Sequence, residues 1–202
     1  MQNKSWHLED AQKLAEQYPY TFHKPSKQVI FQLEVGSLVK LIFKFESNDP
    51  EAPSAERMWV QIIEVTKTGF RGLLDNEPIH IKDLYYQDHI EFQECHIIDT
   101  DLDDPVPSIV NKYLKRCFVT NNILYEGQAV GYLYREESDN KDDSGWRFTT
   151  SHETDEYMND SNNSSYVSLG AVLRIDDSFI SLLDLATGAA FIKNTEGVFI
   201  PA

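Results

Sequence analysis

The hydrophobic pattern of the first 36 residues predicts two helices before any strand. Between Ser5 and Tyr18 the apolar positions recur every three or four residues, which is the spacing of one helix face, with Ser5 as the N-cap and Pro19 as the stop. A second and shorter helix is expected to begin at Pro25-Ser26 and to end at Gly36. The chain is therefore expected to open with a helical lead-in.

Short apolar segments separated by turn residues then predict a small, strongly curved sheet or barrel. The expected strands cover residues 37–46, 58–65, 70–74 and 89–92. The second and third strands would be joined at hairpin spacing through Thr68-Gly69. Residues 48–54 are rich in Pro, Asn and Asp, which predicts a loop between the first two strands.

The acidic run from Asp99 to Pro107 contains two prolines, which is the composition of a domain boundary. We therefore expect two modules, residues 1–99 and residues 100–202. A loop within one domain is the alternative, because the run contains no flexible Gly/Ser linker.

The second half of the chain has the pattern of a mixed module. Expected strands cover residues 116–120, 129–135, 146–150, 188–192 and 198–200. Helical segments are expected over residues 109–114 and 154–158, and periodicity does not decide between helix and strand for residues 166–175. The predicted fold class is α+β in two small modules, a helical lead-in with a small curved β-sheet or barrel followed by a mixed α+β domain.

The net charge of the chain indicates which classes of partner it can bind. The 202 residues include 18 basic and 33 acidic side chains, a formal net charge of −15. This excess argues against nucleic acid and against an anionic membrane surface, and it favours rapid encounter with a basic protein. The first ten residues lack the apolar core of a signal peptide, and no apolar run approaches the roughly 18–20 residues of a membrane span, so we expect a cytoplasmic protein.

The sequence offers little catalytic or metal chemistry. Its six histidines show no HxxxH or HxH spacing, residues 139–144 and 160–165 fail the calcium-loop pattern, and no GxSxG, GxGxxG or P-loop motif occurs. Cys95 and Cys117 have no metal-ligand spacing and are expected to be reduced, although one disulfide between them stays possible. We therefore expect a protein that is not an enzyme and uses no cofactor or metal; a hydrolase with Glu153 or Glu156 as base is the alternative.

The densest group of aromatic, cationic and acidic side chains lies between Asp143 and Tyr157. Residues 136–160 hold nine acidic and two basic residues, a balance of −7. Such a segment forms either a solvated face or an interaction surface for a basic partner. The candidate partner-binding residues are Asp142, Asp143, Trp146, Arg147, Glu153, Asp155, Glu156 and Tyr157.

The position of Arg147 beside Trp146 leads to two hypotheses about what its side chain contacts. Because side chains alternate along a strand, Arg147 should point away from Trp146. It would then pair with Glu153, Asp155 or Glu156 in a structural clasp. Alternatively, it would be presented to a partner side chain together with Glu153 and Tyr157.

Three segments of the second half resemble the immunity protein 33 family, an uncharacterised bacterial domain. These segments are VGYLYRE (130–136), DSGWRF (143–148) and ETDEYM (153–158). The resemblance extends from about Lys115 to the C-terminus and implies an antidote in a polymorphic toxin system. It carries no known catalytic residue.

Three segments of the first half resemble a second uncharacterised bacterial family, found in small YegJ-like proteins. They are VGSLVKL (35–41), ERMWV (56–60) and GLLDNEP (72–78), within roughly Phe31 to Phe92. Ser37 stands where that family is expected to have Asp. This family also brings no known catalytic residue.

The sequence as a whole favours a bacterial, two-module, protein-binding function. The principal hypothesis is an immunity protein that occludes a basic toxin through the acidic surface between Asp142 and Glu156. The alternative is a housekeeping or regulatory adaptor that binds a peptide or protein through its N-terminal sheet, near Tyr85 and Tyr86.

Overall fold

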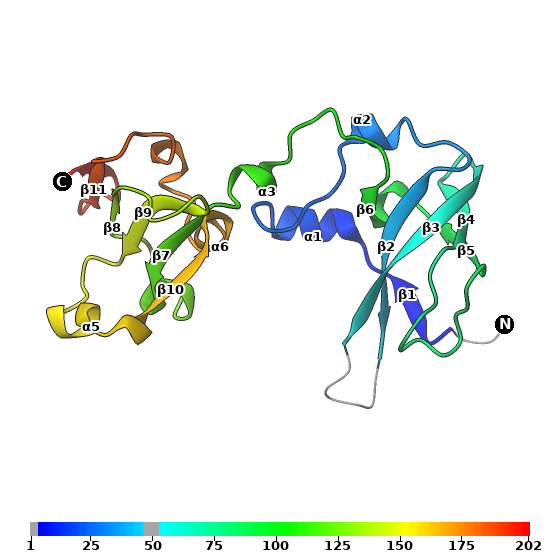
Figure 1. Cartoon of the computed structure of the whole chain (residues 1–202), viewed down its shortest axis with the longest axis horizontal. Coiled ribbons are helices and arrows are strands. Elements are labelled where there is room, and N and C mark those ends of the chain that lie inside the picture. The colour runs from blue at the N-terminus through cyan, green and yellow to red at the C-terminus, as the bar shows by residue number, and fades with distance from the viewer. Residues whose placement is uncertain (1–3, 47–52) are drawn as a thin grey trace. The chain divides into compact units, whose positions relative to one another are not determined.

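The computed structural model describes residues 4–46 and 53–202. The chain divides into two compact units, Met1–Ser108 and Ile109–Ala202, and each contains a sheet of its own (Figure 1). Most of the loop expected over residues 48–54 lies outside the described residues. The α+β class expected for both modules is confirmed.

The N-terminal unit opens with a strand, so the predicted start of the first helix at Ser5 was wrong. Strand β1 (Trp6–Leu8) precedes helix α1 (Ala11–Gln17), whose N-cap is Asp10. The Asp10 carboxylate accepts hydrogen bonds from the first-turn amides of Gln12 and Lys13. Trp6 is buried against Phe43 of the sheet, with ring centroids 5.2 Å apart, and this packing explains why the first apolar residues are extended.

The second expected helix is present as α2 (Lys27–Ile30), and Ser26 caps it by accepting a hydrogen bond from the amide of Val29. Its expected end at Gly36 was wrong, because the helix ends at Ile30. The strands that follow are β2 (Leu38–Phe45), β3 (Ala55–Val65), β4 (Phe70–Leu74), β5 (His89–Phe92) and β6 (Ile97–Thr100), with the 3₁₀ turn η1 (Glu94–His96) between the last two.

These strands form an antiparallel sheet in the order β1-β2-β3-β4-β5, and β6 also pairs with β2. Because the chain passes from β5 at one edge of the sheet to β6, which pairs back with β2, the sheet curls into a nearly closed barrel. Alternate residues of β2, including Leu41 and Phe43, fill its core, while Ile42 on the other face is covered by Ala11 of α1.

The acidic, proline-containing segment after β6 is held on the N-terminal unit. Asp104 accepts hydrogen bonds from the amide and hydroxyl of Ser26, each 2.7 Å long. His23 Nδ1 lies 2.9 Å from Ser108 Oγ. The first unit therefore extends to Ser108, whereas the boundary expected from the sequence, Asp99, lies inside β6.

The C-terminal unit combines short helices with a six-stranded mixed sheet. Its helical elements are α3 (Ile109–Lys112), α4 (Asn121–Leu124), α5 (Asp155–Asn159), η2 (Ser161–Asn163), α6 (Leu169–Leu173) and η3 (Ile180–Leu182). Its strands are β7 (Arg116–Thr120), β8 (Tyr132–Arg135), β9 (Asp143–Thr149), β10 (Ser164–Ser168), β11 (Ala190–Lys193) and β12 (Phe199–Pro201). The order is β10-β7-β9-β8-β11-β12, and β7 and β9 run parallel while the other neighbours run antiparallel.

The core of this unit lies on one face of the sheet, where α6 packs against β7 and β10. Trp146 and Phe148 of β9 point into it, and the Phe148 ring centroid lies 4.8 Å from that of Phe179. The indole Nε1 of Trp146 donates a hydrogen bond of 3.2 Å to the carbonyl of Leu183, so this buried polar atom is satisfied.

Candidate partner-binding surface

Strand β9 is the central strand of the C-terminal sheet and holds three of the eight candidate residues. It lies between β7 and β8, and all seven of its residues are buried. Trp146 points into the core, as described above. Asp143 and Arg147 lie four residues apart, on the opposite face of the same strand, because strand side chains alternate.

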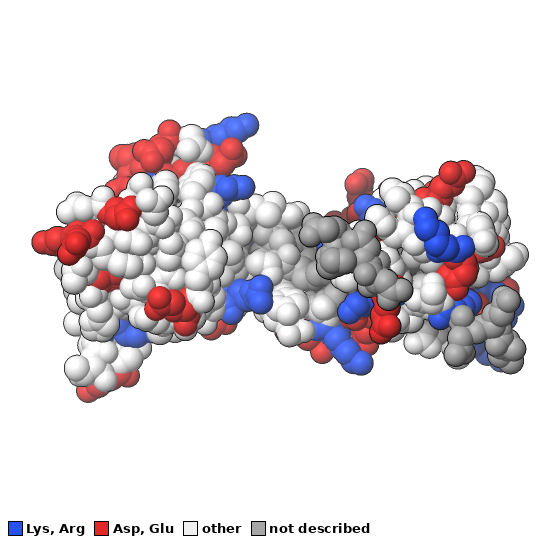
Figure 2. All heavy atoms as spheres, turned by 90° about the horizontal axis from the view of Figure 1, so that it is seen from below, with Lys and Arg blue, Asp and Glu red and all other residues white. Residues whose placement is uncertain are grey.

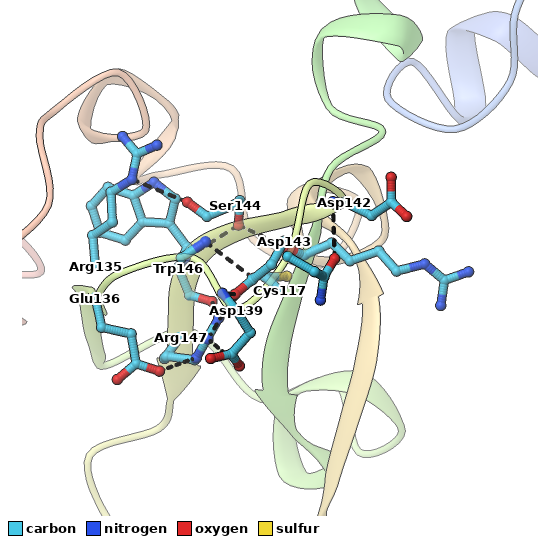
Figure 3. A network of polar contacts seen from close by, with 12 residues as sticks. Cys117, Arg135, Glu136, Asp139, Asp142, Asp143, Ser144, Trp146 and Arg147 are labelled. Carbon is cyan, nitrogen blue, oxygen red and sulfur yellow. Dashed lines mark hydrogen bonds and ion pairs between the residues drawn. The ribbon is translucent and has the colours of Figure 1, made fainter.

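Arg147 holds the buried Asp143 carboxylate with two hydrogen bonds. Its Nη1 and Nη2 atoms lie 2.9 Å from Oδ1 and Oδ2 of Asp143, a bidentate geometry that fixes both groups (Figure 3). Its Nε atom donates a hydrogen bond of 2.6 Å to Oε1 of Glu136. Its Nη2 atom lies 3.6 Å from Oδ2 of Asp139, which makes an ion pair. We call these four residues the Arg147 clasp.

The clasp is internal to the protein and sets the ionisation of Asp143. The hydrogen bonds from Arg147 lower the pKa of Asp143 to about 2, and the amides of Asp139 and Gly145 add to this effect against burial, which raises the pKa. The side chain of Arg147 is 7% exposed and that of Asp143 is fully buried. The clasp therefore anchors the loop of residues 136–142 to the start of β9.

The expected pairing of Arg147 with Glu153, Asp155 or Glu156 was wrong. The guanidinium of Arg147 binds Asp143 at the start of β9. Glu153 lies beyond the end of β9 and accepts hydrogen bonds at that end. Glu153 accepts hydrogen bonds from the Thr120 hydroxyl at 2.6 Å and from the Thr150 amide at 2.9 Å. Burial alone would raise the pKa of Glu153, but these hydrogen bonds lower it below its ordinary value.

The exposed carboxylates of the candidate set lie in two groups. Asp142 is exposed and immediately precedes β9, whereas Asp155 and Glu156 are exposed in the first turn of α5, after the strand. The seven residues of β9 span about 20 Å at roughly 3.3 Å per residue. Glu137, which is not among the candidate residues, is exposed in the same loop as Asp142. We call the exposed carboxylates of Glu137 and Asp142 the loop end, and those of Asp155 and Glu156 the helix end.

Tyr157, the last candidate residue, is half-buried beside the helix end. Its hydroxyl donates a hydrogen bond of 3.3 Å to the carbonyl of Asn163, and its amide donates to the hydroxyl of Thr154, the N-cap of α5. Tyr157 thus supports the turn that presents Asp155 and Glu156.

The acidity of the C-terminal unit is concentrated in one segment. Residues 109–202 contain eight basic and 14 acidic residues, a balance of −6, while residues 136–160 alone have a balance of −7. The rest of the unit is therefore close to neutral. Figure 2 shows one face of the chain, on which charged residues of the C-terminal unit, at left, lie mainly around the margin of an uncharged area.

Other chemistry is limited in the part of the chain that the structure describes. Residues 4–46 and 53–202 contain no group of three His, Cys, Asp or Glu side chains arranged to hold a metal ion. Within these same ranges, no helix is both long and apolar enough to traverse a bilayer. Cys95 and Cys117 are free and lie in different units, and burial raises the pKa of both thiols.

Each half of the chain matches the model of a protein family. Residues 2–103, half of the chain, match the model of an uncharacterized protein conserved in bacteria (DUF2314). The chain belongs to the DUF2314 family. Residues 117–202 of this DUF2314 member match a second model, the immunity protein Imm33 domain, so both expected resemblances are confirmed. Neither the curated proteins nor the solved structures include a significant match.

The region that matches the Imm33 domain contains the acidic segment. The matched region begins in β7 and includes β9, the Arg147 clasp, the loop end and the helix end. An immunity-type domain suggests a non-catalytic protein with a toxin as its protein partner.

Proposed function

We propose that the C-terminal unit binds and occludes a basic protein toxin through its acidic surface. The observation that carries this proposal is the pair of exposed acidic groups, the loop end and the helix end, within the region that matches the Imm33 domain. Occlusion requires a complementary surface and no reactive group. We place this encounter in the cytoplasm, where thiols such as the two free cysteines stay reduced.

The exposed carboxylates of the C-terminal unit favour fast association with a basic partner. Opposite charge on two surfaces steers their encounter and raises the association rate constant, while like charge suppresses wrong partners. The four carboxylates of the loop end and helix end have no ion pair within the described residues, so their charge is available to a partner. By contrast, the charges of Asp143 and Arg147 neutralise each other inside the clasp.

The test is protection against the cognate toxin. Wild-type protein should abolish toxicity on co-expression, and the charge-reversed double variant Asp142→Lys/Glu156→Lys should bind the purified toxin with an association rate constant at least tenfold lower. The double variant Asp75→Lys/Glu77→Lys is the matched control, because it makes the same charge change at exposed positions of the N-terminal unit.

Two results would contradict the proposal. One is full toxicity in the presence of wild-type protein with no complex formed. The other is an equal loss of association rate in both double variants, which would show that net charge, and not the acidic surface of the C-terminal unit, governs binding.

A second function, an adaptor that binds through the N-terminal unit, is favoured by one exposed segment. Ile79 is 71% exposed, Tyr85 is 65% exposed and Tyr86 is 53% exposed, all between β4 and β5. Under this alternative, Tyr85→Ala/Tyr86→Ala abolishes partner binding and Asp142→Lys/Glu156→Lys does not. The principal proposal requires the opposite pattern.

A further inference from the structure

The C-terminal sheet has an outer face, opposite the face that α6 covers. Because Cys117 and Val119 of β7 point into the core, Phe118 between them points to the outer face. The same alternation places Tyr132 and Tyr134 of β8 on the outer face, since Leu133 is fully buried in the core. The apolar and aromatic residues of this outer face are Phe118, Tyr132, Tyr134, Tyr166, Ile192 and Ile200.

Strand register brings these side chains into one stripe across the sheet. Tyr166 of β10 is opposite Phe118 of β7, Phe118 is opposite Arg147 of β9, and Arg147 is opposite Tyr134 of β8. The ring centroids of Phe118 and Tyr166 are 4.8 Å apart, and those of Tyr132 and Tyr134 are 5.5 Å apart. The Arg147 guanidinium lies over Phe118, with 4.9 Å between its Cζ and the ring centroid.

This stripe is ordered before any partner arrives. Contacts between neighbouring rings restrict their rotation, so little side-chain entropy is lost when a partner covers them. Rigid aromatic side chains are the residues that most often contribute the largest share of binding energy at protein interfaces. Phe118 is 38% exposed, Ile192 39% and Ile200 43%, whereas Tyr132, Tyr134 and Tyr166 are half-buried.

The outer face lies between the two acidic ends of β9. Its six strands contain 28 residues, each about 3.3 Å along the strand and about 4.8 Å across, which gives a sheet area of roughly 440 Å². A standard interface covers about 800 Å² on each partner, with an apolar centre and a polar rim. The sheet alone covers about half of this area, and its aromatic residues with the two acidic ends beside them have this arrangement of an apolar centre and a polar rim.

The Arg147 clasp connects the centre of this surface to its rim. Arg147 contacts the Phe118 ring on the outer face while it binds Glu136 and Asp139 of the loop that carries Glu137 and Asp142. The clasp is therefore a positioning device, which holds the loop end at a fixed place beside the aromatic stripe.

We infer that the outer face is where the basic partner docks, with apolar side chains of the partner on the Phe118–Tyr166–Tyr134 stripe and its Lys and Arg side chains at both acidic ends. The inference rests on the proposed function for the existence of the toxin partner. A second copy of this chain would set two acidic rims against each other, and a nucleic acid would bring phosphates against carboxylates, so charge disfavours both.

The test measures binding kinetics of the full chain with the purified cognate toxin. Phe118→Ala and Tyr134→Ala should raise Kd at least tenfold, mainly through faster dissociation, because they remove apolar contacts that the partner makes after the encounter. Asp142→Lys/Glu156→Lys should instead lower the association rate constant. Leu185→Ala is the matched control, since Leu185 is 41% exposed just after η3, away from the stripe, and it should leave Kd within twofold.

Ile200→Lys keeps the inference testable if Phe118→Ala disturbs folding. Ile200 is exposed on an edge strand, and a cation there should weaken binding of a basic partner at least tenfold without altering the unfolding midpoint. Wild-type Kd in Phe118→Ala, Tyr134→Ala and Ile200→Lys, with binding lost in the acidic double variant, would overturn the inference while the proposed function stands. No binding by wild-type protein would overturn both.

Discussion

Arg147 pairs with the buried Asp143, packs on Phe118 and binds Glu136 at the start of the acidic loop. Its guanidinium binds the buried Asp143 in a bidentate geometry, and its own side chain is 7% exposed. Replacing Arg147 by Met leaves the Asp143 charge buried without its partner. We predict that Arg147→Met lowers the free energy of unfolding by about 3–5 kcal/mol, the usual cost of breaking a buried ion pair from one side, as measured by urea denaturation.

Arg71→Met is the control for this prediction. Arg71 also pairs with two carboxylates, Glu64 and Glu91, but all three side chains are at least half exposed. Surface pairs of this kind contribute about 0–1 kcal/mol, so this variant should be close to wild type. Equal losses in the two variants would show that the burial of the clasp has no energetic role.

The pH dependence of stability should report Asp143. Its folded-state pKa of about 2 is below the ordinary value of 3.8, so its contribution to stability is complete above about pH 4 and is lost as the pH falls toward 2. At neutral pH this contribution is about 2–3 kcal/mol. Asp143→Asn should therefore be less stable than wild type at pH 7, with the difference shrinking between pH 4 and pH 2; a constant difference over that range would contradict the assignment.

At this scale the sequence predicts side-chain direction better than side-chain partners. Strand alternation correctly placed Trp146 and Arg147 on opposite faces. The same alternation puts Asp143, four residues earlier, on the face of Arg147, so the position of Asp143 also follows from the sequence once the strand is extended to residue 143. Glu136 and Asp139 reach Arg147 through a loop, and no periodic pattern reveals where a loop returns.

At the scale of elements, Gly145 lets the start of β9 lie close to the end of β8. Gly145 has a φ of +79°, and a Cβ atom there would lie 2.3 Å from the Glu136 carbonyl oxygen. That oxygen belongs to backbone, which cannot move aside without breaking the hydrogen bond from the Glu136 amide to the Gly145 carbonyl. We predict that Gly145→Ala destabilises the protein by more than about 2 kcal/mol in thermal or urea unfolding, the combined cost of strain and displacement.

Gly127→Ala separates these two costs. Gly127 has a φ of +70°, but a Cβ atom there would meet nothing within 4 Å. This control should therefore show only the conformational cost of about 1 kcal/mol. If the two variants lose equal stability, the close approach at Gly145 is not the cause.

The elements themselves followed from the sequence wherever one pattern governed a whole segment. The strands expected over residues 37–46, 70–74 and 89–92 correspond to β2, β4 and β5. Residues 166–175 gave no clear period because the end of β10 and all of α6 lie within them, joined at Ser168. The first helix was placed too early because Leu8 fits the helical spacing of Ala11 and Leu14. Trp6 and Leu8 are two residues apart, the spacing of one strand face, and both pack on the barrel core.

At the scale of the whole molecule, the two units are each expected to fold alone. Each has its own sheet and its own buried core, and the segment up to Ser108 is bound to the first unit through Asp104. We predict that residues 109–202 expressed alone give a cooperative unfolding transition and well-dispersed amide resonances. A fragment without cooperative unfolding would show that the C-terminal unit needs the N-terminal one.

What the sequence did not reveal at this scale is the division of the acidic segment into two ends. Asp142 and Glu156 are 14 positions apart and looked like parts of one surface. The buried strand β9 separates them, and the outer face also includes β7, β8, β10, β11 and β12, which come from residues 116–201. Such a surface follows from strand order, which hydrophobic periodicity does not encode.

The most direct test of the account is the association rate constant of the full chain with its cognate toxin at low and high salt. Electrostatic steering by the loop end and helix end predicts at least a tenfold decrease in the wild-type rate constant between 20 and 300 mM salt, on the order expected for steered association. The same measurement on Asp142→Lys/Glu156→Lys should show a slower rate and a much weaker salt dependence. A wild-type rate constant that does not change with salt would contradict the claim that this acidic surface captures a basic partner.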